Sequence, residues 1–218
     1  SDPKEQVSMS VHGGLFISVE GIDGVGKSTQ ISALVEHLTA AGREVVHTFE
    51  PGGTELGQEI RHLLLHRKGD VAPRAEALLY AADRAHHVAT KIRPALERGA
   101  VVVTDRYLDS SVAYQGAGRA LDSAEVRALS MFAVENLLPD LTVLLDLPAE
   151  QALARRAKTG QEPDRLEREK VEFFEAVRQA YLEMAAREPE RWLVIDASAS
   201  IEVMQEQIRD RVKQLLAR

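Results

Sequence analysis

The segment GIDGVGKST, residues 21–29, carries glycines, a lysine and hydroxyl residues at a spacing that suits phosphate binding. It fits the pattern G-x-x-x-x-G-K-[ST] and lies between an apolar run, LFISVE, and a helical pattern, QISALVEHL. In that frame the curled backbone turns its N–H groups toward an anion, Lys27 reaches the outer phosphates, and the Ser28 hydroxyl can bind Mg²⁺. A glycine-rich turn that only packs is the competing interpretation. We predict a nucleoside triphosphate site formed by these residues: Gly21, Ile22, Asp23, Gly24, Val25, Gly26, Lys27, Ser28 and Thr29.

Asp105 and Arg106 stand at the end of a second apolar run, AVVVTD. An aspartate there can hold Mg²⁺ through water, and the adjacent arginine offers a planar fork to a phosphate. A turn cap for Asp105 and a surface ion pair for Arg106 are the ordinary alternatives. Because ligands of α/β proteins bind at the carboxyl ends of strands, we predict that both residues belong to the site.

The basic segment QALARRAKTGQEPDRLERE, residues 151–169, is a third candidate. Gly160 and Pro163 interrupt its helical charge pattern, which predicts two helices joined by a mobile loop. A solvated charged face is the usual explanation of such a run. In a protein that transfers a phosphoryl group, cations would be needed around the moving group and water would have to be excluded, and the segment would then act as a lid. Its candidate cations are Arg155, Arg156, Lys158 and Arg165.

Short apolar strands alternate with amphipathic helices along the chain, which predicts an α/β fold. Right-handed connections between the strands give a three-layer sandwich with a five-stranded parallel sheet. The expected strands are residues 15–20, 44–48, 100–105, 141–147 and 192–196. The main expected helices are residues 27–40, 54–65, 74–98 and 123–138.

Length and charge limit the possible functions. The 218 residues, 44% of them hydrophobic, suit one domain, which we expect over residues 13–218 after a disordered tail or tag remnant at 1–12. With 27 basic and 34 acidic residues, the formal charge of −7 argues against nonspecific nucleic-acid binding. There is no cysteine, no signal-peptide pattern and no apolar run of the roughly 18 residues that a membrane span needs. We expect a cytoplasmic protein.

Phosphate-loop proteins include GTPases, motor ATPases and small kinases. The guanine signature N-K-x-D does not occur in this sequence, and motors usually need a longer chain. A small kinase remains, and its acceptor must be read from other segments.

Four segments resemble the thymidylate kinase family, whose members transfer phosphate from ATP to dTMP. They are EGIDGVGKST, EPGGT at 50–54, LLYAADRAHH at 78–87 and DRYLDSSVAYQG at 105–116. The resemblance implies a fold of the nucleoside monophosphate kinase type, with ATP and Mg²⁺ as cofactors and dTMP as acceptor. It also implies a homodimer, for which the apolar helix at 123–138 could supply an interface or could equally be core.

The resemblance further implies roles for individual residues. Asp23 looks like the carboxylate that meets the sugar 3′-hydroxyl, and Arg106 like the arginine that holds the acceptor phosphate. Tyr80 matches the aromatic residue that stacks on thymine, although ordinary helix packing would also explain it, and Arg84 the arginine that bonds a thymine carbonyl. The residues expected to read the base N3 or to line the sugar and base are Ser111, Tyr114 and Gln115.

One position departs from the family pattern. Many bacterial members have arginine immediately before EPGGT, where this chain has Phe49. One contact to the acceptor phosphate is therefore missing or made by another residue, and we expect Glu50 to position Arg106 instead.

The phosphate loop and the lid together resemble one branch of the family. One branch has arginine in place of Gly24 and a lid without catalytic basic residues, whereas this chain has Gly24 and a basic lid, as in the bacterial-type branch. Glu167 resembles a carboxylate near the nucleotide or metal, or is simply an exposed helical residue. The expected catalytic residues are Lys27, Asp105, Arg106, Arg155 and Arg165, and the expected metal ligands are Ser28 and Asp105.

Two other functions stay open on the sequence. One is a kinase for another nucleotide, deoxynucleotide or deoxynucleoside. The other is a regulatory switch that binds nucleotide and signals through lid closure. Formation of ADP that depends on dTMP would distinguish the expected enzyme from both.

Overall fold

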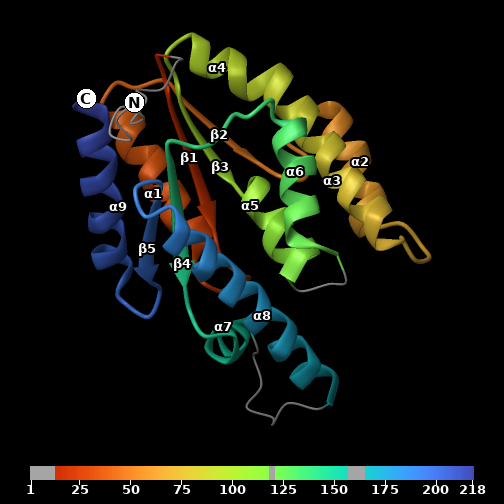
Figure 1. The fold of residues 1–218 in the computed structure, drawn as a ribbon. Helices are drawn as coiled ribbons and strands as arrows, with labels where there is room; N and C mark the ends of the chain where they lie inside the picture. The colour runs from red at the N-terminus through yellow and green to blue at the C-terminus, as the bar shows by residue number, and fades with distance from the viewer. Residues whose placement is uncertain (1–12, 118–120, 157–164) are drawn as a thin grey trace, which may run out of the picture.

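A five-stranded parallel sheet forms the centre of the molecule (Figure 1). This computed structural model describes residues 13–117, 121–156 and 165–218, apart from the side chains of residues 165–169. The strand order is β2-β3-β1-β4-β5, and every neighbouring pair is parallel. The bounds are β1 Leu15–Glu20, β2 Val45–Phe49, β3 Val101–Asp105, β4 Leu141–Asp146 and β5 Trp192–Asp196. The predicted α/β class is confirmed, and the expected tail at 1–12 lies outside the described residues.

Helices cover both faces of the sheet (Figure 1). They are α1 Lys27–Ala40, α2 Glu55–Leu65, α3 Pro73–His87, the π-helix η2 Val88–Ile92, α4 Arg93–Glu97, α5 Leu108–Ser111, the π-helix η3 Val112–Ala117, α6 Ser123–Ala133, α7 Ala149–Arg156, α8 Arg165–Arg187 and α9 Ile201–Leu216. Of the helices in the described part of the chain, none is both long enough and apolar enough to cross a membrane.

Two apolar clusters hold these layers together. On one face, Ile17 of β1 packs in a cluster with Ile31 of α1 and Ile208 of α9. On the other face, Phe16 packs with Ile92 of η2 and with other residues of that side. Neighbouring residues of β1 thus enter different clusters, so this strand buries apolar side chains on both faces.

Two expected helices differ from the observed ones. The helix expected at 74–98 contains the π-helical segment η2 just before Pro94. Proline has no N–H to give to the carbonyl four residues earlier, so the helix widens there instead of continuing regularly. The helix expected at 123–138 ends at Ala133, because Glu135 and Asn136 turn into the left-handed region with φ of 49° and 60°.

The carboxyl ends of β1, β2 and β3 lie at one edge of the sheet. Val19 pairs with Asp105, and Asp105 pairs with Phe49 on its other side. The chain leaves β1 past β3 to form β2, returns to β3, and then adds β4 and β5 on the opposite side of β1. The order reverses at β1, and such a switch point is where ligands bind in sheets of this kind.

Candidate active site

The phosphate loop joins β1 to α1 and depends on glycines for its shape. Gly21, Gly24 and Gly26 have φ of 143°, 90° and 92°, a region that side chains rarely tolerate. Space is a second requirement, because a Cβ on Gly24 would lie 2.4 Å from the carbonyl oxygen of Ala152 in α7. A Cβ on Gly26 would meet nothing within 4 Å, so the loop is open on that side.

Lys27 begins α1, and its side chain folds back over the loop. Its Nζ donates to the carbonyl oxygen of Gly21 over 2.9 Å and lies 3.8 Å from Oδ1 of Asp105. Burial, followed by the neighbouring charge of Arg106, lowers the pKa of Lys27 to about 8. Lys27 is therefore a buried cation between the phosphate loop and the end of β3.

The residues at this edge fit a Mg²⁺ ion held jointly with phosphates. Oδ1 of Asp105 is buried and accepts no hydrogen bond in the described part of the chain, and Ser28 is exposed in the first turn of α1. Hydroxyl and carboxylate oxygens are ligands that Mg²⁺ accepts, with phosphate oxygens and water completing its shell. Within the described ranges no cluster of three His, Asp or Glu side chains could hold a metal by itself.

Arg106 has an unusual backbone and a loosely bonded side chain. Its φ of 73° is left-handed, and its N–H and carbonyl are bonded to Val19 and to the hydroxyl of Thr104. Its Nη2 donates to Asp23 and to Tyr114, each over 3.3 Å. Burial works against the charge, but the surrounding oxygens, among them those of Tyr114 and Asp23, keep the pKa of Arg106 above its ordinary value. These bonds are long, so the guanidinium is placed in the site without a tight ion pair.

Glu50 and Arg84 form a buried ion pair under the acceptor side. Nε of Arg84 donates to Oε1 of Glu50 over 2.6 Å, and Nδ1 of His87 lies 2.7 Å from Oε2. Burial opposes ionisation of Glu50, but Arg84 and His87 outweigh it and hold the pKa of Glu50 below its ordinary value. The expectation that Glu50 positions Arg106 is wrong, because both carboxylate oxygens are taken by α3.

Arg84 also reaches the segment that follows β3. Its Nη1 donates to the hydroxyl of Ser111 at the end of α5 over 2.9 Å. Gln115 lies on η3, which follows directly, and its buried Oε1 has no hydrogen-bond partner in the described part of the chain. An unpartnered buried polar atom needs an explanation, and a bound base would supply the missing partner.

Tyr80 and Tyr114 supply aromatic rings from α3 and η3, and both are half-buried. The ring of Tyr114 lies against Phe173 and Phe174 of α8, with centroids 6.1 and 6.4 Å away, and the Arg106 guanidinium lies 5.0 Å from its centre. Tyr114 is thus fixed between Arg106 and the helix that follows the lid segment.

Arg155 and Arg156, at the end of α7, have different partners. Nη2 of Arg155 donates to the carbonyl oxygen of Ala197, just after β5, over 2.9 Å. Nη1 of Arg156 lies 3.5 Å from Asp23 of the phosphate loop. The side chain of Arg165 lies outside the described residues, as do Lys158 and the side chain of Glu167.

Three buried residues near the candidate site are not among those predicted from the sequence. Asp83 is buried in α3 and accepts the N–H of Gly52 over 2.9 Å, so it holds the EPGG loop, yet it reads as an ordinary helical aspartate. Glu20 and Tyr181 are buried behind Arg106. A carboxylate that ends the apolar run LFISVE was a usable signal for Glu20, whereas nothing in the helical pattern distinguishes Tyr181.

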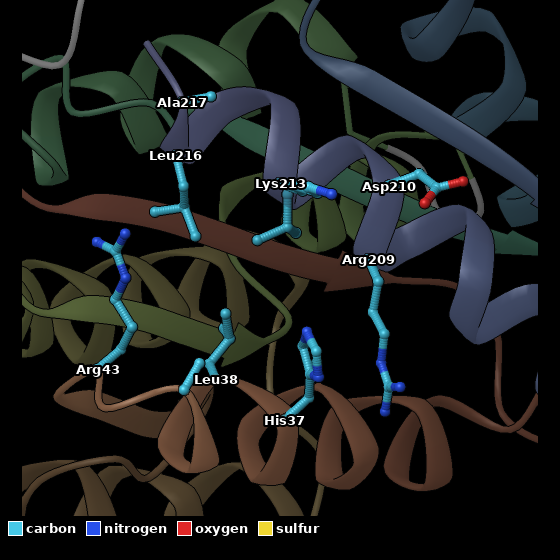
Figure 2. Close-up of a pocket in the computed structure, with 10 residues that line it drawn as sticks. His37, Leu38, Arg43, Arg209, Asp210, Lys213, Leu216 and Ala217 are labelled. Atoms are coloured by element: carbon cyan, nitrogen blue, oxygen red, sulfur yellow. The ribbon is translucent and has the colours of Figure 1, made fainter.

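A surface groove of about 510 Å³ lies elsewhere, between α1 and α9 (Figure 2). His37 and Leu38 line it from α1, and Arg209 and Lys213 line it from α9. It contains none of the residues described above, so groove size does not locate the candidate site.

The comparisons with known proteins agree with this geometry. A family model described as thymidylate kinase matches residues 19–208. The thymidylate kinase of Clavibacter sepedonicus is 63% identical over 204 residues, which cover 94% of this chain and 97% of the relative. That of Leifsonia xyli subsp. xyli is 64% identical over 199 residues, 91% and 94% of the two chains. That of Chromohalobacter salexigens is 49% identical over 210 residues, 94% and 97% of the two chains. With its parallel sheet, phosphate loop and facing arginine, this chain belongs to the thymidylate kinase family.

Proposed function

We propose that the chain phosphorylates dTMP to dTDP, with ATP as phosphoryl donor and Mg²⁺ as cofactor. The observation that carries this proposal is the meeting of Arg106 with Asp23. An arginine at the end of β3 lies 3.3 Å from a carboxylate of the phosphate loop, so an acceptor phosphate held by that arginine would face the donor. The family membership supplies the identity of the acceptor.

In the proposed reaction, an oxygen of the dTMP phosphate attacks the γ-phosphorus of ATP. The bond to the bridging oxygen breaks, and ADP leaves with that oxygen. A phosphate monoester is already nucleophilic near neutral pH, so no side-chain base and no covalent enzyme intermediate are needed. Mg²⁺, held by Ser28 and Asp105, would neutralise charge on the donor phosphates. Lys27 and Arg106 place cations on the two sides of the transferred group.

For the acceptor pocket we keep the roles that the resemblance implies. Tyr80 stacks on thymine, Arg84 bonds a thymine carbonyl, and Ser111 reads the base N3. Tyr114 and Gln115 line the sugar and base, and the buried Oε1 of Gln115 has no other partner among the described residues. The role of Glu50 differs from the one expected from the sequence. We propose that Glu50 fixes the orientation of Arg84 and His87 and does not contact the substrate.

We propose that residues 151–169 form the lid and bring further arginines to the phosphates. The contact between Arg156 and Asp23 supports Arg156 as a candidate beside Arg155 and Arg165. Arg155 bonds the segment after β5, so it would act near the donor and not near the acceptor phosphate. The cytoplasmic location expected from the sequence stays a prediction.

We also propose that two copies associate. Large apolar side chains are exposed on the adjoining helices α2, α3 and α6: Phe132 is 84% exposed, Leu78 57% and Leu63 42%. Covering such a patch is favourable in water, and the resemblance implies a homodimer.

A coupled ADP-release assay over a panel of nucleoside monophosphates tests the enzymatic proposal. We expect turnover with dTMP to exceed that with dUMP, dCMP and dGMP, and we expect thymidine to be inactive because it lacks the attacking phosphate. ATP binding without any dependence of ADP release on dTMP would contradict the proposal.

A further inference from the structure

Arg106 is supported from behind by two hydroxyl groups. Its Nη1 donates to Oγ of Ser110 over 3.3 Å and to the phenolic oxygen of Tyr181 over 3.5 Å. Each of these hydroxyls donates to Oε2 of Glu20, Ser110 over 2.5 Å and Tyr181 over 2.8 Å. Glu20, Ser110 and Tyr181 come from β1, α5 and α8, and all three are buried.

The carboxylate determines which way the two hydroxyls point. In its ionised form the Glu20 carboxylate only accepts, so the hydroxyl hydrogens are then directed at Glu20 and the oxygen lone pairs remain for Arg106. The other oxygen, Oε1, accepts the backbone N–H of Tyr107 over 2.8 Å, which fixes the carboxylate itself. The guanidinium of Arg106 thus contacts the two hydroxyls, and the hydroxyls in turn contact the carboxylate of Glu20.

This arrangement differs from the other buried ion pairs of the chain. Arg84 is bonded directly to Glu50 over 2.6 Å, and Arg191 directly to Asp109 over 2.9 Å. A direct bidentate or short pair engages the donors of an arginine. Hydroxyls placed between Arg106 and Glu20 orient the guanidinium through long bonds of 3.3 and 3.5 Å, which an incoming anion displaces more readily than a short, direct ion pair.

We propose that Glu20, Ser110 and Tyr181 are positioning residues that aim Arg106 at the phosphate of the acceptor nucleotide. The inference rests on the proposed function. Tyr181 is the most useful of the three residues to substitute, because it lies on α8, a different element from the end of β3 that carries Arg106.

Stability alone does not account for a carboxylate at this position. The pKa of Glu20 is raised to about 7, because burial, the largest influence, outweighs the lowering by Arg106; Asp109 also raises this pKa, and the hydrogen bonds from Ser110 and Tyr181 lower it. The charge of Lys27 in α1 also interacts with Glu20. Burying a carboxylate that has no direct basic partner is unfavourable, so an uncharged residue would suit the fold better.

The substitution Tyr181→Phe tests the inference, with Tyr107→Phe as the matched control. Tyr107 is also a fully buried tyrosine, but its hydroxyl donates to the carbonyl oxygen of Leu137 over 2.8 Å, away from Arg106. We expect Tyr181→Phe to lower kcat/KM for dTMP by about 5- to 10-fold, with KM for ATP changed by less than about twofold. The control should lose thermal stability to a similar extent without that selective effect.

Two further variants separate positioning from packing. Glu20→Gln should reproduce the selective loss, because an amide NH₂ can donate to the hydroxyls and reverse their direction. In an Arg106→Ala background, Tyr181→Phe should cause no additional loss, because the group that it positions is gone. A full additional loss in that background, or an equal effect on the dTMP and ATP parameters, would overturn the inference.

The wild-type assay distinguishes failure of this inference from failure of the function. If wild-type protein releases no ADP in response to dTMP, the proposed function is overturned and this inference with it. If wild-type turnover is normal and Tyr181→Phe leaves kcat/KM for dTMP unchanged, only the positioning role is overturned.

Discussion

Two arginines of the acceptor side show how the partner decides what a side chain can do. Arg84 is almost fully buried and bonds Glu50 and Ser111 at 2.6 and 2.9 Å, so its Nε and Nη1 are held by short bonds within the protein. Among the described residues, the hydrogen bonds of the Arg106 guanidinium are 3.3 to 3.5 Å long and go to hydroxyls and to the exposed Asp23. The same residue type is therefore an orienting element in one place and a candidate phosphate ligand in the other.

At the residue scale, we expect Lys27→Ala and Arg106→Ala to lower different kinetic parameters. Loss of Lys27 should lower turnover by about 100-fold or more, because a preorganised cation at the transferred group is removed. Loss of Arg106 should also weaken the use of dTMP, which appears as a lower kcat/KM for that substrate. Steady-state kinetics with each substrate varied separately checks both outcomes, and near-normal turnover by Lys27→Ala would contradict the mechanism.

Asp83 gives a prediction on pH and stability. Burial, then the nearby charge of Glu50, raises the pKa of Asp83 to about 6 from an ordinary value of 3.8. Between these pH values the folded protein binds more protons than the unfolded chain, so this group makes stability fall as pH rises. Asp83→Asn keeps an oxygen to accept from Gly52 and has no charge to lose.

The variant should therefore gain stability relative to wild type as pH rises from 4 to 7, by about 1 to 3 kcal/mol. Urea unfolding at several pH values measures the difference directly. A difference between the two proteins that does not change with pH would show that Asp83 has no raised pKa.

At the scale of elements, the phosphate loop and α7 are in direct contact. Gly24 of the loop approaches Ala152 so closely that a Cβ would lie 2.4 Å from its carbonyl oxygen. Arg155 and Arg156 follow at the end of the same helix. Because Gly24 has no Cβ, the phosphate loop can lie this close to the helix that carries Arg155 and Arg156.

We expect Gly24→Ala to push α7 away from the loop and to lower both turnover and stability, the latter by about 1 to 3 kcal/mol. Gly69→Ala is the control, because Gly69 has a similar φ of 100° but nothing within 4 Å of its Cβ position. Thermal melting and turnover of the two variants separate the close contact from backbone strain. Equal losses in both variants would mean that the approach of α7 does not matter.

At the scale of the whole molecule, the site faces one edge of the sheet and the exposed apolar patch lies on the helices of one face. Phe132 on α6 and Leu78 on α3 are the most exposed large apolar residues of these helices. Leu78 lies on α3, and α6, which carries Phe132, packs against α3. Because α3 also carries Tyr80 and Arg84, which we propose bind the acceptor, association and acceptor binding would involve the same helix.

We expect Phe132→Asp to weaken self-association, because it places a charge in the centre of the proposed contact. Light scattering coupled to size-exclusion chromatography should show a shift from dimer to monomer. Ile201→Asp is the control, because Ile201 is 51% exposed but lies at the start of α9. An unchanged mass for Phe132→Asp would place the dimer contact elsewhere. A monomeric wild-type protein would contradict the proposed association of two copies.

Local sequence determined the architecture and was sufficient to propose the donor side of the site. The apolar runs, the spacing of Gly21, Gly26 and Lys27, and the position of Asp105 and Arg106 at the end of a strand all depend on neighbours along the chain. Tertiary structure alone decided that Glu50 bonds Arg84 and His87, 34 and 37 residues away, and that Tyr181 reaches Glu20 across 161 residues. The reason is physical: periodicity and turn chemistry report contacts within a few residues, whereas the partner of a buried charge depends on which elements pack together.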